Sequence, residues 1–223
     1  MPTEAPESAA PAPPTALRWL APLLVLPVLG FAVWFAVAML RAVPPPALEV
    51  GPDVTVLRAP LPLSEFTLGD HHGEPFDGAR FDGRWSFVFF GYTFCPDVCP
   101  MTLSTFRGVR ERLGDDAELQ YVFVSIDPER DTLERLAEFV PYFHPEFVGV
   151  TGNHDELVNL TRTLGVYHQK ADGESGPDYL MDHTISVMLI DPERRMSAIF
   201  SKPDDPDAIA DAFRKIREQG TMP

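Results

Sequence analysis

The run WSFVFFGY at residues 85–92 constrains the fold of this chain more than any other stretch. It carries no charge, and apolar or aromatic side chains occupy nearly every position. A continuous apolar run without alternation is typical of a strand that is buried on both faces. We therefore expect residues 85–92 to lie in the middle of a sheet that is covered on both sides.

Other strand and helix patterns alternate along the chain after this run. Residues 119–126 and 147–152 predict two more buried strands. Helical spacing of apolar residues or helix-start signals appear at 101–113, 131–143, 154–165 and 205–219. Two late strands joined by PERR are expected at 185–191 and 196–201, and a short N-terminal hairpin at 66–68 and 74–76.

The order of these elements, βαβα followed by ββα, is the thioredoxin pattern with additions. It predicts an α/β fold in which helices flank a mixed central sheet. We expect this sheet to be mostly parallel, with an antiparallel pair formed by its last two strands. The hairpin would be an N-terminal extension of that fold.

An uncharged segment precedes the predicted fold. Residues 19–40 contain no charged side chain, and Arg18 and Arg41 flank them. This length is sufficient to span a bilayer, and the acidic, Pro-rich start argues against a cleaved signal peptide. We therefore predict a tail at 1–18, a single transmembrane anchor at 19–41, a Pro-rich linker at 42–50 and one domain at 51–223.

The charge of the chain excludes some classes of partner. The formal net charge is −15, and the first 45 residues contribute two acidic and two basic side chains, so the net charge belongs to the predicted domain. A strongly negative surface repels phosphate groups. We therefore expect no nucleic-acid binding, and we expect the partners to be proteins or cations.

The only two cysteines, Cys95 and Cys99, lie in the segment GYTFCPDVCP. A proline follows each of them, which disfavours the α conformation at both cysteines. Pro100 suits the first position of a helix, so we expect Cys99 at the N-cap and both thiols at the helix N-terminus. The helix dipole would lower the pKa of at least one thiol.

A close thiol pair forms a disulfide or supplies two soft metal ligands. A structural disulfide is disfavoured, because closing so short a loop constrains the unfolded chain little. Two cysteines alone do not complete a structural zinc site, which has four ligands. Cu(I) is soft and accepts low coordination, so two thiolates and one imidazole would bind it.

Two histidines remain as candidates for the imidazole. His168 follows Tyr167, at a possible strand edge, and His183 directly precedes a predicted buried strand. A thioredoxin-like fold returns the chain beside its cysteines at the position of His183. A solvated or capping role is expected for the other four histidines, His71, His72, His144 and His154.

Three motifs in order resemble the Sco/SenC family of copper-handling, thioredoxin-like proteins. They are GYTFCPDVCP at 91–100, SIDPERDT at 125–132 and YLMDHTISVMLID at 179–191, and the likeness extends from Gly51 to the C-terminus. The resemblance implies that Cys95, Cys99 and His183 bind one copper ion, as Cu(I) or Cu(II). Asp182 would orient the imidazole. For Asp131 we expect a helix cap.

The same resemblance implies a function, a partner and a location. A protein of this family would deliver copper to the CuA centre in subunit II of cytochrome c oxidase, with other copper chaperones as further partners. Such a metallochaperone would not be an enzyme. The absence of an Arg- and Ser-rich transit segment favours a bacterial inner membrane, with a single-pass anchor and the domain in the periplasm.

Two enzymatic alternatives use the same cysteines. A thiol-disulfide oxidoreductase would need only Cys95 and Cys99 and would reduce the cysteines of the copper-receiving subunit. A peroxidase of the peroxiredoxin type is disfavoured, because the Pro-x-x-x-Thr-x-x-Cys pattern is absent: Thr93 lies two residues before Cys95 rather than three.

Overall fold

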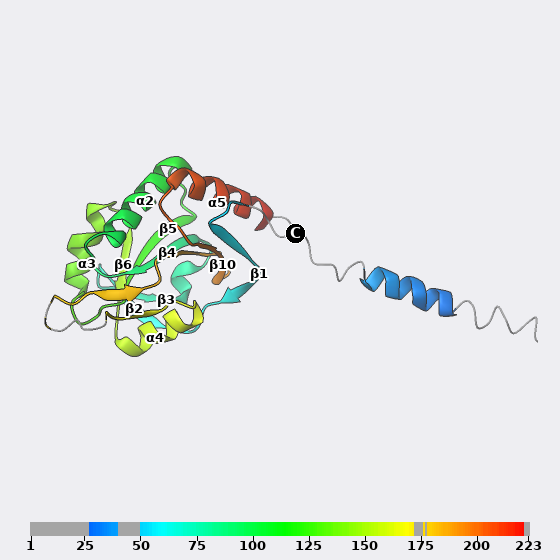
Figure 1. Ribbon diagram of the computed structural model, residues 1–223, viewed down its shortest axis with the longest axis horizontal. Helices are drawn as coiled ribbons and strands as arrows, with labels where there is room; N and C mark the ends of the chain where they lie inside the picture. Colours follow the sequence, from blue (N-terminus) through cyan, green and yellow to red (C-terminus); the bar gives the residue numbers. More distant parts are fainter. Residues whose placement is uncertain (1–26, 40–49, 172–175, 177, 221–223) are drawn as a thin grey trace, which may run out of the picture. The chain divides into compact units, whose positions relative to one another are not determined.

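The computed structural model describes residues 27–39, 50–171, 176 and 178–220 (Figure 1). Its contacts divide the chain into two units, Met1–Pro46 and Ala47–Pro223. In the first unit, residues 27–39 form a helix with mostly exposed apolar side chains. Within the described ranges, no helix combines the length and the apolar character needed to cross a membrane. The predicted tail, the linker up to residue 49 and both ends of the anchor lie outside these ranges.

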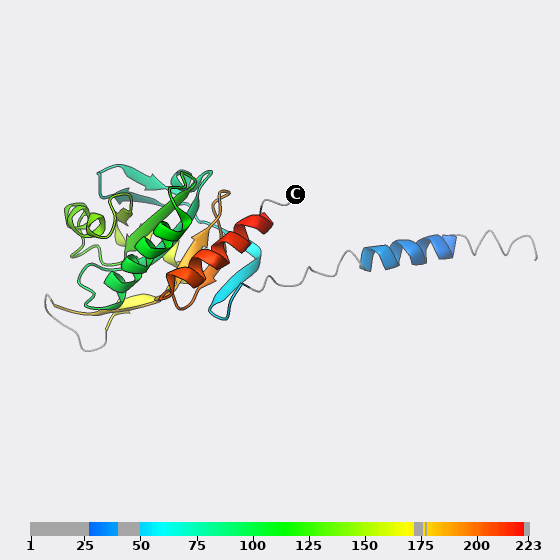
Figure 2. The same cartoon turned by 90° about the horizontal axis from the view of Figure 1, so that it is seen from above.

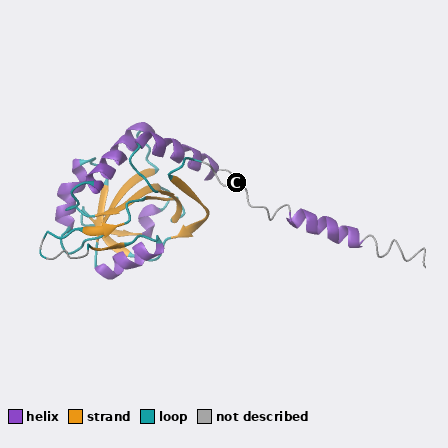
Figure 3. Ribbon diagram, in the orientation of Figure 1, coloured by secondary structure: helices purple, strands orange, loops and turns teal. Residues whose placement is uncertain are grey.

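The second unit is built around one eight-stranded sheet, with helices on both faces (Figures 1 and 3). In spatial order the strands are β1 (Val54–Pro62), β10 (Arg195–Phe200), β9 (Val187–Ile190), β4 (Trp85–Gly91), β5 (Leu119–Ser125), β6 (Val148–Thr151), β2 (Thr67–Asp70) and β3 (Pro75–Asp77). The helices are α2 (Val98–Leu113), α3 (Leu133–Phe139), α4 (His154–Thr163) and α5 (Pro206–Gly220), with 3-10 turns η1 (Gly78–Phe81) and η2 (Val140–Tyr142). Every residue of β4 is buried, as predicted.

The sheet is mixed, but the expectation that it is mostly parallel is wrong. Parallel pairing joins β4 to β5 and β5 to β6, and the other five neighbouring pairs in the described sheet are antiparallel. The sequence did not predict β1, whose half-exposed residues include an arginine and two prolines. Such an edge strand lacks a long apolar run. The predicted hairpin, β2 with β3, joins the same sheet through β6.

Alternate side chains of the central strands form two separate cores. Phe87 and Phe89 of β4 pack on one face with residues of α2, α3 and α5, whereas Val88 and Phe90 pack on the other with residues of α4 and the hairpin. Figures 1 and 2 show α2 and α5 side by side over one face, and Figure 1 shows α4 on the opposite side. Because successive strand residues point to opposite faces, one apolar run supplies both cores.

Two further strands form a separate ribbon outside the main sheet (Figure 2). β7 (His168–Lys170) and β8 (Met181–His183) pair antiparallel, and His168 lies opposite His183. The sequence did not predict this ribbon, because each strand has only three residues and none is fully buried. The ribbon matters because it carries both candidate imidazoles, His168 on β7 and His183 on β8.

Gly91 ends β4 at a close approach between the sheet and α2. A Cβ atom at this position would lie 2.6 Å from Cys99 Sγ and 2.9 Å from the Phe123 ring. Both neighbours are buried, so neither has free space into which it could move. Glycine at the last residue of β4 therefore makes room for the Cys99 thiol.

We expect Gly91→Ala to lower the free energy of unfolding of the metal-free protein by about 1–3 kcal/mol, the usual cost of overpacking a core. Urea denaturation measures this change. Gly78→Ala is the matched control, because its Cβ would come no closer than 3.7 Å to another residue. That control should stay within about 0.5 kcal/mol of the native protein. Equal stability of the two variants would contradict the packing argument.

Candidate metal centre

Three soft ligand atoms converge at the end of β4. Cys95 lies in the loop after this strand, Cys99 in the first turn of α2, and His183 at the end of β8. The two sulfurs and one imidazole nitrogen all lie within 4.8 Å of one another, and Cys99 Sγ is 3.8 Å from His183 Nε2. The structure thus brings together the three residues that the resemblance implied as ligands. Two thiolates with one imidazole form a donor set that suits copper.

Cys99 does not cap the helix, so that expectation is wrong. The N-cap is Asp97, α2 begins at Val98, and Pro100 occupies the third helical position. A proline is tolerated there because the first four N–H groups of a helix have no partner within the helix. The first backbone hydrogen bond of α2 runs from the Met101 N–H to the Asp97 carbonyl, at 3.2 Å. Cys99 therefore adopts the α conformation, although the proline that follows it disfavours this conformation. In this position its thiol is buried.

The two thiols differ in exposure and in acidity. Cys95 is half-buried, whereas Cys99 has no exposed surface, and no disulfide joins them. The pKa of Cys95 lies far below its ordinary value, first because the Cys99 thiol hydrogen-bonds to its sulfur, and also because the His183 ring and the N–H groups of Asp97 and Cys99 stabilise the thiolate. The pKa of Cys99 is raised, because its thiol donates this hydrogen bond to Cys95 and because the thiol is buried. The prediction that one thiol at this helix end is acidified holds for Cys95.

The His183 imidazole is oriented by a backbone group. Its Nδ1 lies 2.9 Å from the carbonyl oxygen of Thr184, and a carbonyl only accepts, so Nδ1 carries the proton. In the neutral ring this leaves a lone pair on Nε2, the nitrogen that faces Cys99. The orienting role expected for Asp182 therefore belongs to Thr184. The Asp182 side chain is exposed, because alternation along β8 places it on the other face of the ribbon from His183.

Tyr92 connects the cysteine loop to the ribbon. Its hydroxyl accepts a hydrogen bond from the Met181 N–H at 3.3 Å and also contacts Cys95. Its ring packs edge-on against the His183 imidazole, with ring centres 5.8 Å apart. The ring of Phe89 lies 6.1 Å from the same imidazole. Sequence analysis missed Tyr92 as a site residue, because an aromatic residue after a buried strand reads as part of the core.

A buried carboxylate fixes the start of the cysteine loop. Asp131 has no exposed surface and accepts hydrogen bonds from the Thr93 N–H (2.8 Å), the Thr93 hydroxyl (2.6 Å) and the Ser125 hydroxyl (2.6 Å). Burial raises the pKa of Asp131 above its ordinary value, and the three hydrogen bonds reduce this increase without cancelling it. The expected helix cap at Asp131 is wrong. Thr132 caps α3, because its side chain accepts the Arg135 N–H at 3.2 Å.

The site opens to solvent through a shallow depression of about 330 Å³. Cys95 and His183 line this depression, and Cys99 lies buried beside them. Its other lining residues are Tyr92, Pro96, Asp97, Val98, Ala171, Leu180, Met181, Asp182 and Ile185. A metal ion held here would be accessible from one side, which suits exchange more than permanent storage.

The side chain of His168 points away from the cysteines, unlike that of His183, its partner on the ribbon. Its Nε2 lies 3.3 Å from the Thr161 hydroxyl of α4 rather than beside a cysteine. The pKa of His168 is lowered, chiefly by burial. Of the two imidazoles that the sequence left open, the structure places His183 with the thiols.

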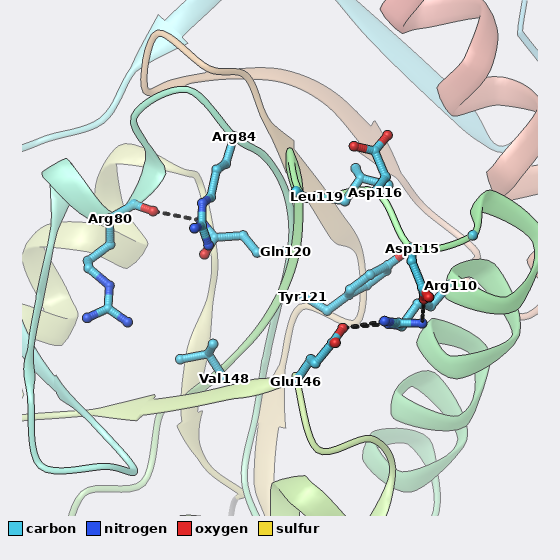
Figure 4. A pocket seen from close by; sticks show the side chains of 12 residues that line it. Arg80, Arg84, Arg110, Asp115, Asp116, Leu119, Gln120, Tyr121, Glu146 and Val148 are labelled. Atoms are coloured by element: carbon cyan, nitrogen blue, oxygen red, sulfur yellow. Dashed lines mark hydrogen bonds and ion pairs between the residues drawn. The ribbon is translucent and has the colours of Figure 1, made fainter.

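A second cavity, of about 410 Å³, contains none of the predicted ligands (Figure 4). Arginines and acidic residues line much of it, and several pair across it: Arg110 donates to Glu146 through Nε at 2.9 Å and lies 2.9 Å from Asp115. Figure 4 shows these three side chains gathered beside Tyr121. Because its lining carries no thiol or imidazole, this cavity is not a candidate for a soft metal.

The difference between the thiols predicts selective alkylation. At pH 7, iodoacetamide should modify Cys95 of the reduced, metal-free protein at least about ten times faster than Cys99, because Cys95 is more exposed and is already a thiolate. A lowered pKa also means that the Cys95 rate changes little between pH 6 and 8, whereas an ordinary thiol with a pKa near ~8.5 becomes about tenfold faster per pH unit. Peptide mapping by mass spectrometry measures both rates.

Cys95→Ser is the control for this measurement, since Cys99 then stands alone and should still react slowly because it is buried. Equal labelling of the two cysteines in the native protein would contradict the assignment. So would a Cys95 rate that rises steeply with pH.

Comparisons with known proteins agree with this geometry. A family model described as SCO1/SenC matches residues 58–218. The mitochondrial SCO2 homologue of Bos taurus is 31% identical over 196 residues, which is 86% of this chain and 74% of that protein. The mitochondrial SCO2 homologue of Mus musculus is 32% identical over 154 residues, 68% of this chain and 60% of that protein. The chain therefore spans less than two thirds of the mouse relative.

Solved structures show the same fold. Arabidopsis thaliana ScoI with copper bound has a TM-score of 0.66 and 33% identity, covering 70% of this chain and 98% of that chain. Bradyrhizobium japonicum ScoI with copper bound has a TM-score of 0.62 and 33% identity, covering 69% and 99%. The thioredoxin-like α/β fold with a mixed sheet is thus confirmed. With the family model matched over residues 58–218, this chain belongs to the SCO1/SenC family.

Proposed function

We propose that this protein is a copper chaperone that binds one copper ion through Cys95, Cys99 and His183. The observation that carries the proposal is the convergence of two sulfurs and an imidazole nitrogen within 4.8 Å. The Nδ1–H bond to the Thr184 carbonyl supports it further, because the free Nε2 is then the ligand atom. Two relatives in the same family were solved with copper bound.

The recipient that we propose is the CuA centre in subunit II of cytochrome c oxidase, as the family likeness implies. A protein recipient is supported by the exposed apolar side chains of Phe94, Met101, Leu180 and Ile185, close in sequence to the ligands. Exposed apolar groups that surround a site are typical of protein contact surfaces. Other copper chaperones would use the same surface to load the protein.

We also propose a single-pass anchor at 19–41 in a bacterial inner membrane, with the copper-binding domain in the periplasm. The uncharged run and its flanking arginines support the anchor. A bacterial relative supports the bacterial part of this proposal: the SCO2-like protein RC0895 of Rickettsia conorii is 36% identical over 129 residues, 57% of this chain.

A second function, thiol-disulfide exchange, is favoured by one specific observation. Cys95 is accessible and acidified, whereas Cys99 is buried beside it and keeps its proton. An accessible thiolate attacks a partner disulfide to form a mixed disulfide, and a nearby second thiol then releases the partner as a reduced dithiol while the protein's own two cysteines become a disulfide. Reduction of the recipient cysteines would prepare them for copper, so both functions are compatible.

The first test is a Cu(I) competition titration of the reduced full-length chain in detergent. The native protein should bind one equivalent tightly. His183→Ala should weaken binding at least about 100-fold, since the loss of a supporting residue alone costs about 10–100-fold at metal sites. His72→Ala is the control, because His72 is exposed in the turn after β2 and should leave the affinity unchanged.

Unchanged affinity in His183→Ala would remove this residue from the ligand set and direct the next test to His168. No tight binding by the native chain would leave thiol-disulfide exchange as the function.

Thiol exchange should separate from copper binding in the same variants. Cys95→Ser and Cys99→Ser should each abolish both activities, because both need the thiol pair. His183→Ala should retain disulfide exchange with glutathione within about tenfold, since both reacting sulfurs remain and His183 is only one of several groups that lower the pKa of Cys95. Stopped-flow mixing of the oxidised protein with reduced glutathione measures the rate. A large loss in His183→Ala would show that the histidine serves the thiol chemistry as well.

A further inference from the structure

The third ligand of the proposed site comes from an element that is not part of the main sheet. Cys95 and Cys99 follow β4, the most buried strand, whereas His183 lies on the β7–β8 ribbon, whose strands pair only with each other among the described strands. The distance between His183 Nε2 and the thiols therefore depends on what holds this ribbon against the cysteine loop. The Met181 N–H bond to Tyr92 is one such contact.

Arg130 makes a second connection between the two parts. Its guanidinium carbon lies 3.5 Å from the ring centre of Tyr179, 4.7 Å from that of Phe94 and 5.7 Å from that of Tyr92. The side chain is only 11% exposed. Tyr179 leads into β8, whereas Phe94 and Tyr92 belong to the cysteine loop. A desolvated cation among aromatic faces is a strong contact of this type.

One carboxylate locks this arrangement in place. Asp127 is 2% exposed; its Oδ2 accepts the Arg130 Nε–H at 2.6 Å, and its Oδ1 accepts the Tyr179 hydroxyl. The Tyr179 ring also contacts Lys170 of β7, whose Nζ lies 4.2 Å from the ring centre and 2.7 Å from Glu129. Residues 127–130 therefore contact both the entry to β8 and a residue of β7.

We propose that Arg130, with Asp127 and Tyr179, forms a ribbon clamp that positions His183 over the two thiols. Arg130 is a positioning residue, because it acts through the ribbon. The inference rests on the proposed function and deepens it. Without the clamp, the two cysteines keep their places after β4, and only the imidazole loses its fixed distance. Copper would then be held by two protein ligands in place of three.

A double-mutant cycle tests the clamp. Arg130→Met keeps a long apolar side chain and removes the guanidinium. In the full-length reduced chain, it should weaken Cu(I) binding about tenfold, the lower end of the range for residues that support a ligand. In the His183→Ala background the same substitution should change the affinity less than about twofold, because the clamp acts only through His183.

The cycle also separates the clamp from a simple charge effect. Removing a cation near two thiolates would by itself favour Cu(I), and that effect would persist without His183. Arg214→Met is the matched control, because Arg214 pairs with Asp211 three residues away on α5, the same spacing as between Arg130 and Asp127. This variant should leave the copper affinity unchanged.

Tyr179→Phe is a second variant for the case in which Arg130→Met does not fold. It keeps the ring, loses the bond to Asp127 and should weaken binding in the same direction.

A measurement on the metal-free chain tests the clamp independently of the proposed copper-binding function. In the metal-free chain, the NMR signals of the His183 ring should shift or broaden in Arg130→Met and Tyr179→Phe, and not in Arg214→Met. If the native chain binds no Cu(I), the proposed function fails and this readout still decides the clamp. Unchanged His183 signals in both clamp variants would overturn the proposal. So would native copper affinity in Arg130→Met, or an equal loss of affinity in the presence and absence of His183.

Discussion

The buried carboxylate of Asp131 is the contact on which the geometry of the site depends. It receives three hydrogen bonds, from Thr93 at the start of the cysteine loop and from Ser125 at the end of β5. A carboxylate without exposed surface is stable only when such donors replace water. The loop therefore leaves β4 in one direction, and both Cys95 and Cys99 take their positions from it.

The ligands of the proposed site come from two parts of the fold: the cysteines from the rigid end of β4 and the start of α2, and the histidine from the attached β7–β8 ribbon. The rigid part holds the half-buried, acidified thiol of Cys95 and the buried thiol of Cys99 at the start of α2, next to a glycine that leaves room for the Cys99 sulfur. The attached part is the ribbon, whose imidazole is oriented by the Thr184 carbonyl. Soft ligands on separate elements suit an ion that must be bound and then given up, because one ligand can leave without disturbing the other two.

Local patterns predicted more of the fold than of the site. The buried strands β4 and β5 and the α-helices α2 to α5 in the described part of the domain lie where apolar spacing placed them, to within a few residues. Half-exposed β1 and the short ribbon carry no such pattern, and both were missed. His183 was selected through the family resemblance and the expected topology. Asp131 and Asp182 received the wrong roles, because the partner of a side chain is set by packing and not by its neighbours in sequence.

The sequence by itself determined that a strand buried on both faces ends beside the only two cysteines, and that the net negative charge belongs to the predicted domain. It also determined the family, through three motifs in a fixed order. Only the tertiary structure decided which thiol is acidic, which nitrogen of His183 faces the sulfurs, and that Arg130 bridges the ribbon and the cysteine loop. The physical reason is distance along the chain: these contacts join residues tens of positions apart, and hydrogen bonds and desolvation act only once folding has brought them together.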